Sequence, residues 1–470
     1  MGNIKRYIFF SYDGDTFPLA YNLQEEGENV LVCQIQDAAV LGTQNWAAHK
    51  EEPEVRRRRL SLYDGMLKKV PLASAMNQLS AIKNKGECFV VCGDNFLFKI
   101  SERVMAMGFD NGLLPTMKDH EREKDRKKSK EFVKKNYPGL KVSESKEFSK
   151  TDEAIKFIQE SDEFWVVKSD GNFGETIVPD KDDLEMAREQ VVGELQKGKS
   201  LYDKGKLILE PKIMNAIEFS PQMEFYDGEP VCSHVEFETR MFGSGDIGDQ
   251  TGGNENLLIQ TDLDAPINEI AFPEAMRTIA REHRGLFIAE AGILSDGKDL
   301  YFTEFQANRW GWGGVFSEMS MSEGKDGKIS NYFESHVMRE NPFQHKFGSS
   351  LALYTIRSDK KFPALNQEGL SINLKKGVEK DVFLWQCKME QRGKEKQLVN
   401  VGYRELDDSP LGYVVGRGET MEDAVERIYE TLKGVSMKGM YFRPREDFLS
   451  KDYVSAIPNR LNFLQDKKLI

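Results

Sequence analysis

The sequence predicts an α/β fold, and three observations lead to this prediction. Strand-like apolar runs alternate with helical segments in the N-terminal third, which is typical of a parallel sheet. From residue 163 onward the pattern changes to short strands and hairpins. The chain has 470 residues, enough for about three domains or subdomains. We predict an N-terminal parallel-sheet domain (1–115), a central α+β domain (116–340) with a subdomain at about 163–212, and a small, β-rich C-terminal α+β domain (341–470).

The composition excludes several classes of protein. A net charge of −12 argues against nucleic-acid binding through bulk charge. No apolar run approaches the roughly 20 residues that span a bilayer, and the N-terminal apolar run is too short for a secretory signal. The five cysteines form no Cys-x-x-Cys pair, which argues against a disulfide framework or a zinc site. We therefore expect a cytoplasmic protein with neither nucleic-acid nor membrane partners.

The N-terminal third supplies the elements of a parallel sheet. YIFFSYDGD predicts a first strand, and LAYNLQEEGENVLVCQI continues with a helix and a second strand. GECFVVCGDN (86–95) is another apolar strand that ends in a small polar turn. The first strand is not followed by G-x-G-x-x-G, which disfavours a nicotinamide or flavin cofactor.

The segment KDHEREKDRKKSKEFVKK (118–135) is dense in both signs of charge. This pattern predicts a solvated helix with ion pairs between residues four apart. Lys130, near its end, has a second interpretation that is given below.

Several later segments predict strands and hairpins. Tyr-Asp-Gly and Ser-Asp-Gly turns between alternating apolar residues predict two hairpins, at 220–237 and 287–305. FWVVK (164–168) and KLILE (206–210) predict single strands. Near the C-terminus, 420–435 predicts an amphipathic helix with Thr420 as its N-cap.

The segment FWVVKSDGNFGETIV (164–178) has the composition of a phosphate-binding hairpin. Lys168 ends a strand, and a lysine on a rigid sheet can reach phosphate oxygens. Gly171 and Gly174 let backbone N–H groups approach a polyphosphate closely. A plain hairpin with one exposed lysine is the alternative interpretation. No Walker motif, G-x-x-x-x-G-K-[ST], occurs in the chain.

The segment KLILEPKIMNAIEFS (206–220) predicts a strand that runs into a hinge. Backbone groups after Glu210 can pair with the edge of an adenine, and Glu218 can accept hydrogen bonds from ribose hydroxyls. An ordinary strand end is the alternative interpretation.

The segment YFTEFQANRWGWGG (301–314) predicts a metal site at the end of a strand. Side chains alternate along a strand, so Glu304 and Gln306 share one face, which Asn308 continues if the strand stays regular. A carboxylate with an amide oxygen suits Mg²⁺, and Arg309 adds a cation for a phosphate or an oxyanion. An edge strand with exposed polar groups is the alternative.

The order of these segments resembles the layout of the ATP-grasp superfamily. HRGLFIAEAGILSDGKDLYFTEFQANRWG (283–311) and RKKSKEFVKKNYPG are similar to segments of the phosphoribosylamine–glycine ligases. WVVKSDGNFGETIV resembles their V-V-K-A-D-G-L-A-A-G-K-G-V, and GSGDIGDQTGGN (243–254) resembles D-G-D-x-G-P-N-T-G-G-M-G. The similarity spans most of the chain from about residue 115 onward.

The resemblance implies a role for each candidate residue. It places Lys130, Lys168, Gly171 and Gly174 on the phosphates of ATP, Glu210, Lys212 and Ile213 at the adenine, Glu218 at the ribose, Glu304 with Gln306 or Asn308 on Mg²⁺ (or Mn²⁺), Arg309 and Arg240 at the reacting groups, and Thr251, Gly252, Gly253 and Asn254 on the substrate.

The resemblance further implies an ATP-dependent carboxylate–amine ligase that forms an amide through an acyl phosphate. In that family the role is in purine biosynthesis, and the partners would be an amino acid, with glycine the first candidate, and an amine. We expect a monomer or a homodimer.

The sequence departs from the family at several positions. In strict register Gln306 replaces a metal-binding asparagine, Glu175 replaces a lysine of the lid, and WGGVF replaces D-P-E. A diverged ligase for another amino acid and amine, and an inactive nucleotide-binding homologue, therefore stay open. A scaffold that binds a partner through 118–135 is a third alternative.

Overall fold

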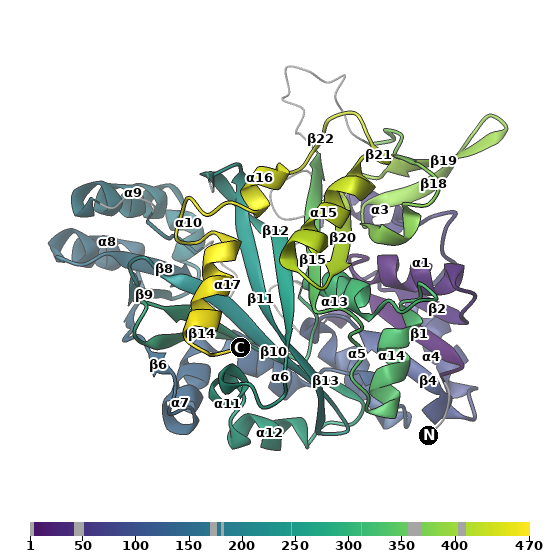
Figure 1. Cartoon of the computed structure of the whole chain (residues 1–470), viewed down its shortest axis with the longest axis horizontal. Helices are drawn as coiled ribbons and strands as arrows, with labels where there is room; N and C mark the ends of the chain where they lie inside the picture. Colours follow the sequence, from purple (N-terminus) through teal and green to yellow (C-terminus); the bar gives the residue numbers. More distant parts are fainter. Residues whose placement is uncertain are drawn as a thin grey trace.

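The computed structural model describes residues 4–41, 51–169, 176–179, 183–245, 247–311, 313–355, 368–402 and 410–470. One large mixed sheet runs through the molecule, and a separate three-stranded sheet lies to one side of it. Along the longest axis, helices α8 (Thr151–Glu160) and α9 (Leu184–Lys197) lie at one end and α1 (Phe17–Glu25) lies toward the other (Figure 1). None of the described helices combines the length and the apolar character needed to cross a bilayer.

The N-terminal part of the large sheet is parallel, as the alternation of strands and helices predicts. Its strand order is β5-β4-β1-β2-β3, and every pair in this order is parallel. The strands are buried apolar runs, so both faces must be covered by helices. The strands are β1 (Arg6–Ser11), β2 (Val30–Gln34), β3 (Lys69–Val70), β4 (Cys88–Cys92) and β5 (Gly112–Leu113); the helices are α1, α3 (Pro53–Ser61), α4 (Leu72–Ser80) and α5 (Phe98–Ala106).

The charged segment 118–135 forms two helices rather than the single solvated helix we predicted. They are α6 (Met117–Lys124) and α7 (Arg126–Asn136). Asp125 ends the first and caps the second, because its side chain accepts a hydrogen bond from the Lys128 N–H. Asp119 and Lys130 are buried, so only part of this segment faces solvent.

The three-stranded sheet forms a small subdomain over the described residues within 146–211. Its order is β7-β9-β8, all antiparallel. It has its own apolar core, which includes Ile155, Val167 and Leu209. The subdomain begins before the predicted boundary at about 163, because β7 and α8 belong to it. Its elements are β7 (Lys146–Phe148), α8, β8 (Trp165–Ser169), α9, α10 (Lys199–Tyr202) and β9 (Leu207–Pro211).

The central antiparallel part of the large sheet contains both predicted hairpins. The first turns at Asp227 and Gly228, whose φ angles of 50° and 82° suit a tight hairpin turn. Leu286 pairs in parallel with Leu113, so this part is continuous with the N-terminal strands. Its elements are β6 (Lys141–Val142), β10 (Ile217–Tyr226), β11 (Glu229–Gly243), β12 (Ile247–Thr261), α11 (Pro266–Ala271), α12 (Glu274–Ala280), β13 (Leu286–Ser295), β14 (Leu300–Ala307), α13 (Gly314–Ser322) and α14 (Ser330–Met338).

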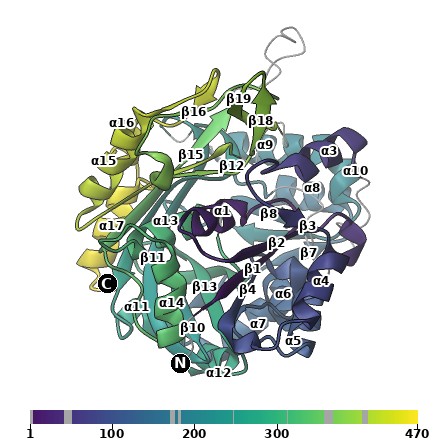
Figure 2. The same ribbon diagram turned by 90° about the vertical axis from the view of Figure 1, so that its right-hand side faces the viewer.

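The C-terminal part extends the same sheet. β15 (Phe347–Thr355) pairs with β12 and with β20 (Gly412–Gly418), which pairs with β17 (Val382–Leu384). The Thr420 side chain caps α15 (Met421–Leu432) as predicted, accepting from the Asp423 N–H at 3.1 Å. Figure 2 shows α15 and α17 on the side opposite α4. The remaining elements are β16 (Asn373–Leu374), β18 (Cys387–Arg392), β19 (Glu395–Asn400), β21 (Val435–Ser436), β22 (Met440–Tyr441), α16 (Arg445–Phe448) and α17 (Ile457–Asp466).

Candidate functional site

A cavity of about 570 Å³ lies between the small subdomain and the large sheet. The small subdomain contributes β8 and β9, and the large sheet contributes β10, β11 and β14. Residues from widely separated segments therefore meet in one place. The predicted site residues that line it are Lys168, Glu210, Lys212, Ile213, Glu218, Arg240 and Glu304.

Glu210 joins the two predicted phosphate-binding lysines. Its carboxylate lies 2.6 Å from the Lys130 ammonium and 3.3 Å from the Lys168 ammonium. Burial alone would raise the pKa of Glu210, but the two positive charges outweigh it and lower this pKa. Burial lowers the pKa of Lys130, with the Glu210 charge acting against it. The group holds two lysines and one carboxylate, so it keeps a positive charge that an anion could neutralise.

The strand end after Glu210 lines the cavity with Pro211, Lys212 and Ile213. The Lys212 N–H donates to the Phe164 carbonyl at 2.8 Å, and the Lys212 ammonium donates to the Pro179 carbonyl at 2.6 Å. Among the described residues, the N–H of Ile213 has no hydrogen-bond partner. This backbone donor faces a cavity that Glu218 also lines.

The β13–β14 hairpin carries the predicted metal-binding carboxylate. Glu304 lies 3.2 Å from Arg126 across the cavity. Burial opposes the ionisation of Glu304, but Arg126, Arg240 and Lys168 outweigh it and lower the pKa of this carboxyl. Glu304 is therefore held as a carboxylate that could bind a divalent cation.

Glu290 is a functional candidate that we did not predict from the sequence. It pairs with Gln306 across the hairpin and accepts a hydrogen bond from its side-chain amide. Burial raises the pKa of Glu290 to about 7, and the negative charges of Glu238 and Glu304 add to this while Arg309 opposes it. The signal that could have revealed Glu290 is a single carboxylate in the middle of an apolar strand.

The structure separates the two amides that the sequence left as alternatives. Gln306 lies on the Glu304 face of β14, with its side chain bonded to Glu290. Asn308 follows the strand with a φ of 52°, is buried, and donates to the Leu114 carbonyl and to Asp119. Asn308 therefore does not lie in the cavity, because the chain turns at that point.

Arg309 also points away from the cavity lining. It donates to the carboxylate of Glu123 in α6 at 2.9 Å. Burial would lower the pKa of Arg309, but Glu123 and Asp94 raise it. Arg309 thus ties the end of β14 to α6, whereas Arg240 lines the cavity beside Glu238.

The predicted substrate residues Thr251, Gly252, Gly253 and Asn254 lie within β12 rather than in the cavity. The Thr251 hydroxyl donates to the Arg240 carbonyl, and the Asn254 amide donates to the Met241 carbonyl at 2.9 Å. They therefore support the strand that carries Arg240. Gly171, Gly174 and Glu175 lie outside the described residues.

Arg460 of α17 is a second residue that we did not predict. It lines the cavity and donates to the carbonyls of Glu218 and Glu238 at 3.3 and 2.9 Å. The C-terminal helix thus holds together the two strands β10 and β11 that present Glu218 and Arg240. A basic residue in an amphipathic helix gives no sequence signal for this role.

The donor set of the cavity fits both a polyphosphate and a hard divalent cation. The Glu304 carboxylate lines the cavity, and the Gln306 amide lies on the same face of β14, in contact with Glu290. Carboxylate and amide oxygens are ligands that Mg²⁺ accepts, and lysines such as Lys168 suit phosphate.

Solved structures with similar folds identify the architecture. The phosphoribosylamine–glycine ligase of Thermotoga maritima matches with a TM-score of 0.60 and 17% identity, over 93% of this chain and 99% of that chain. The chain has the ATP-grasp fold.

Two further structures extend this comparison. The biotin carboxylase domain of the 2-oxoglutarate carboxylase of Hydrogenobacter thermophilus, a complex with MgADP and bicarbonate, matches with a TM-score of 0.55 and 13% identity, over 100% of this chain and 99% of that chain. The phosphoribosylglycinamide synthetase of Anaerococcus prevotii matches with a TM-score of 0.50 and 13% identity, over 92% and 99%. No protein-family model and no curated protein matches the sequence.

Proposed function

We propose that this chain is an ATP-dependent ligase that joins a carboxylate to an amine. The observation that carries this proposal is that Lys168 and Glu210 line one wall of the cavity and Glu304 lines another, with Lys130 held against Glu210. Cations for a polyphosphate and oxygen ligands for its metal ion thus meet in one space. The cavity volume of about 570 Å³ lies within the range of roughly 300–1,000 Å³ for small-molecule sites.

In this proposal each wall of the cavity binds one part of ATP. Lys130 and Lys168 bind phosphate oxygens, and the backbone N–H of Ile213 pairs with the adenine edge. Glu218 accepts from the ribose hydroxyls. Glu304 and Gln306 hold Mg²⁺, which would neutralise phosphate charge, and Glu290 orients Gln306 through their hydrogen bond.

The reaction would take place in two displacements. A carboxylate oxygen of the substrate attacks the γ-phosphorus of ATP, the bond to the β-phosphate oxygen breaks, and ADP leaves. The amine nitrogen then attacks the acyl carbon, the C–O bond to phosphate breaks, and the nitrogen loses a proton as the amide forms. Arg240 is the cation placed to stabilise negative charge on these groups, because it lines the cavity beside Glu304.

The proposed substrates are an amino acid and an amine of small size. Glycine is the first candidate carboxylate, because the similar structure from Thermotoga maritima is a phosphoribosylamine–glycine ligase. A role in purine biosynthesis follows if the amine is phosphoribosylamine. A cytoplasmic location stays a prediction from the cysteines. The oligomeric state, a monomer or a homodimer, also stays a prediction.

A homologue that binds nucleotide without turnover is the second candidate. Two contacts favour it: the Gln306 amide is already bonded to Glu290, and Arg309 is bonded to Glu123 rather than directed at the cavity. In this case ATP would bind with no release of ADP in the presence of any amino acid.

The test is ADP formation by the purified full chain with Mg²⁺-ATP and candidate amino acids, glycine first, with and without amines. We expect Lys168→Ala and Glu304→Ala each to reduce the rate at least about 100-fold, since the first removes a positive charge from the phosphates and the second removes a ligand of their metal ion. Lys168→Ala should also weaken ATP binding by about 10-fold or more, measured by calorimetry.

Matched controls come from the same elements. Lys206→Ala, next to the start of β9, removes an exposed charge, and Asp299→Asn, next to the start of β14, removes a half-buried one. Both residues lie outside the cavity, and both variants should leave the rate unchanged. Near-normal rates in Lys168→Ala or Glu304→Ala would contradict the proposal. ATP binding without amino-acid-dependent ADP release under any condition would support the second candidate.

A further inference from the structure

A second cluster of potential ligands lies in the core, away from the cavity. It consists of Glu224 on β10, Cys232 and His234 on β11, Glu318 on α13 and His336 on α14. We call these five residues the Glu224 cluster. Every member is at most 1% exposed. None of them lines the cavity that holds Lys168 and Glu304.

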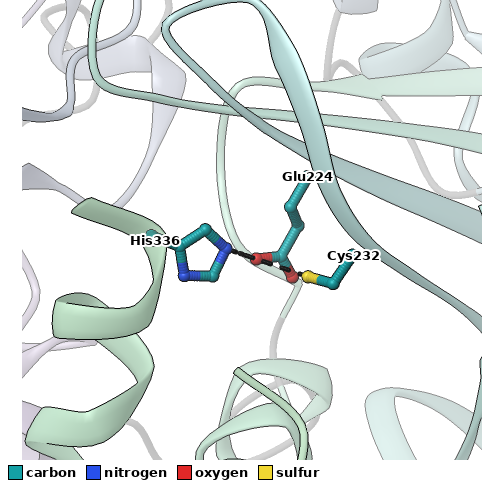
Figure 3. Close-up of side chains that lie close together, drawn as sticks. All are labelled: Glu224, Cys232 and His336. Atoms are coloured by element: carbon teal, nitrogen blue, oxygen red, sulfur yellow. Dashed lines mark hydrogen bonds and ion pairs between the residues drawn. The ribbon is translucent and has the colours of Figure 1, made fainter. Parts of the chain in front are cut away.

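Three members of the Glu224 cluster converge on one point. The Glu224 carboxylate lies between His336 and Cys232 (Figure 3). It is 2.7 Å from His336 Nε2, and Cys232 Sγ is 3.8 Å from the same nitrogen. The ligand atoms of all three residues lie within 4.8 Å of one another.

The orientation of His336 is that of a metal ligand. Its Nδ1 lies 2.7 Å from the backbone carbonyl of Tyr332, and a carbonyl can only accept a hydrogen bond. The proton of a neutral ring is therefore fixed on Nδ1, and the Nε2 lone pair points at Glu224 and Cys232. Metal-binding histidines commonly make this contact with a carboxylate, a carbonyl or water through the other nitrogen.

The two carboxylates of the Glu224 cluster also favour the binding of a cation. Glu224 and Glu318 share the side-chain amide of Gln222, at 3.1 and 2.7 Å. In the described part of the chain, neither carboxylate has a lysine or arginine partner; their ion-pair partners are histidines. Two buried carboxylates without a fixed cation are costly.

His234 gives an independent observation. It is fully buried, and neither of its ring nitrogens has a hydrogen-bond partner among the described residues. A ligand atom of His234 lies within 4.8 Å of those of Glu224 and Glu318. An imidazole that is buried beside two carboxylates, with no hydrogen bond to the described residues, is a candidate for a fourth ligand.

We propose that Glu224, Cys232 and His336 bind a structural zinc ion. Thiolate, imidazole and carboxylate together favour Zn²⁺ over Mg²⁺ or Ca²⁺, which take oxygen ligands. On binding, Zn²⁺ replaces the thiol proton of Cys232 and the proton shared by His336 and Glu224, and both protons leave to water. The distance between His336 Nε2 and Glu224 Oε2 would increase from 2.7 Å to about 3.3 Å. The larger distance is the edge of a tetrahedron with zinc–ligand bonds of about 2.0 Å.

The zinc ion would fix α14 to the β10–β11 hairpin. His336 is the ligand from α14, and Glu224 and Cys232 come from paired positions on the two strands. Tyr332 donates to Glu224 at 2.6 Å and accepts from Trp310, at the end of the segment that carries Glu304. Loss of the metal should therefore loosen the packing behind the cavity.

The test is the metal content of the full chain, expressed with added zinc and measured by mass spectrometry after gel filtration. We expect about one zinc per chain, and less than about 0.2 in Cys232→Ser. Cys387→Ser is the matched control, because Cys387 is also buried but lies on β18, outside the Glu224 cluster, and it should keep the zinc.

A second measurement does not depend on the variants being folded. Wild-type protein refolded with Co²⁺ should show the charge-transfer absorption of a cobalt–thiolate bond, and a chelator should lower the melting temperature by several degrees. Less than about 0.1 zinc per chain in the wild type, together with no cobalt–thiolate absorption, would overturn the proposal and leave the cluster as a hydrogen-bonded network. Zinc that Cys232→Ser retains in a folded state would also overturn it.

Discussion

Glu210 shows how one residue can take a role different from the one its position suggests. The sequence places it at the hinge that would contact adenine, but its side chain is directed at two ammonium groups, at 2.6 and 3.3 Å. The strand end can still present its backbone to a ligand while the carboxylate holds Lys130 and Lys168 in place. The negative charge of a carboxylate between two lysines offsets the repulsion between their ammonium groups before an anion binds.

Gln306 and Asn308 give a prediction at the same scale. Gln306→Ala should raise the Mg²⁺ concentration for half-maximal ADP formation about 10-fold with little change in melting temperature, because it removes a candidate ligand on the Glu304 face of β14. Asn308→Ala should lower the free energy of unfolding by about 1–3 kcal/mol, since it removes a buried donor to the Leu114 carbonyl and one of the donors to Asp119.

Urea unfolding of both variants measures the change in the free energy of unfolding, and Mg²⁺ titration of their ADP formation measures the change in Mg²⁺ requirement. A result in which Asn308→Ala changes the Mg²⁺ requirement while Gln306→Ala changes only stability would reverse the assignment of the two amides.

At the scale of elements, the break between α6 and α7 determines what each of these two helices contacts. It separates α7, on which Lys130 contacts Glu210 of the cavity wall, from α6, which packs against β14. On α6, Glu123 accepts from Arg309 at 2.9 Å and from the Asn95 amide at 2.7 Å. Removing one partner of a buried ion pair leaves an unpaired buried charge, which costs more free energy than breaking an exposed pair. A buried pair such as Glu123–Arg309 therefore orients a strand end more firmly than an exposed pair would.

Glu123 carries a prediction of pH dependence. Burial alone would raise its pKa, but Arg309 and Lys124 outweigh it and lower the pKa to about 2. A lowered carboxyl pKa contributes stability that is present above the unfolded value of about 4.3 and is lost as pH falls toward 2. Glu123→Gln should therefore reduce the free energy of unfolding by about 3 kcal/mol at pH 7, and this difference should shrink below about pH 4.

Urea denaturation of wild type and variant between pH 7 and pH 3 measures this difference. Glu121→Gln, an exposed carboxyl on the same helix, is the control and should show almost none. A constant difference across this range would show that the charge of Glu123 is not its cause.

At the scale of the whole molecule, the cavity depends on parts that are distant in sequence. The small subdomain supplies Lys168 and Glu210, the large sheet supplies Arg240 and Glu304, and α17 supplies Arg460. The small subdomain has a separate sheet and a separate core, and we expect it to move as a unit. A nucleotide that contacts both walls would restrict this motion.

Hydrogen exchange measures this effect. Mg²⁺-ADP should slow amide exchange in β8 and β9 severalfold, with little change in β1, β2 and β4, which lie in a different part of the large sheet. The same experiment on Lys168→Ala should show much less protection. Equal protection of β1 and β8 would instead indicate a general stabilisation of the chain.

The sequence by itself determined the local elements of this protein. Hydrophobic periodicity and turn residues gave the parallel strands, both hairpins and the capped helix α15, because these patterns depend on neighbouring residues only. The order of lysine, hinge and acidic strand also predicted the fold, which the similar solved structures confirm.

Only the tertiary structure decided which side chains meet. The contact of Asn308 with Asp119 and the ion pair of Arg309 with Glu123 of α6 join segments far apart in the chain. No sequence motif indicated Glu290, Arg460 or the Glu224 cluster, because their contacts join residues from different strands and helices. Burial and charge pairing act through space, so residue spacing along the chain does not encode them.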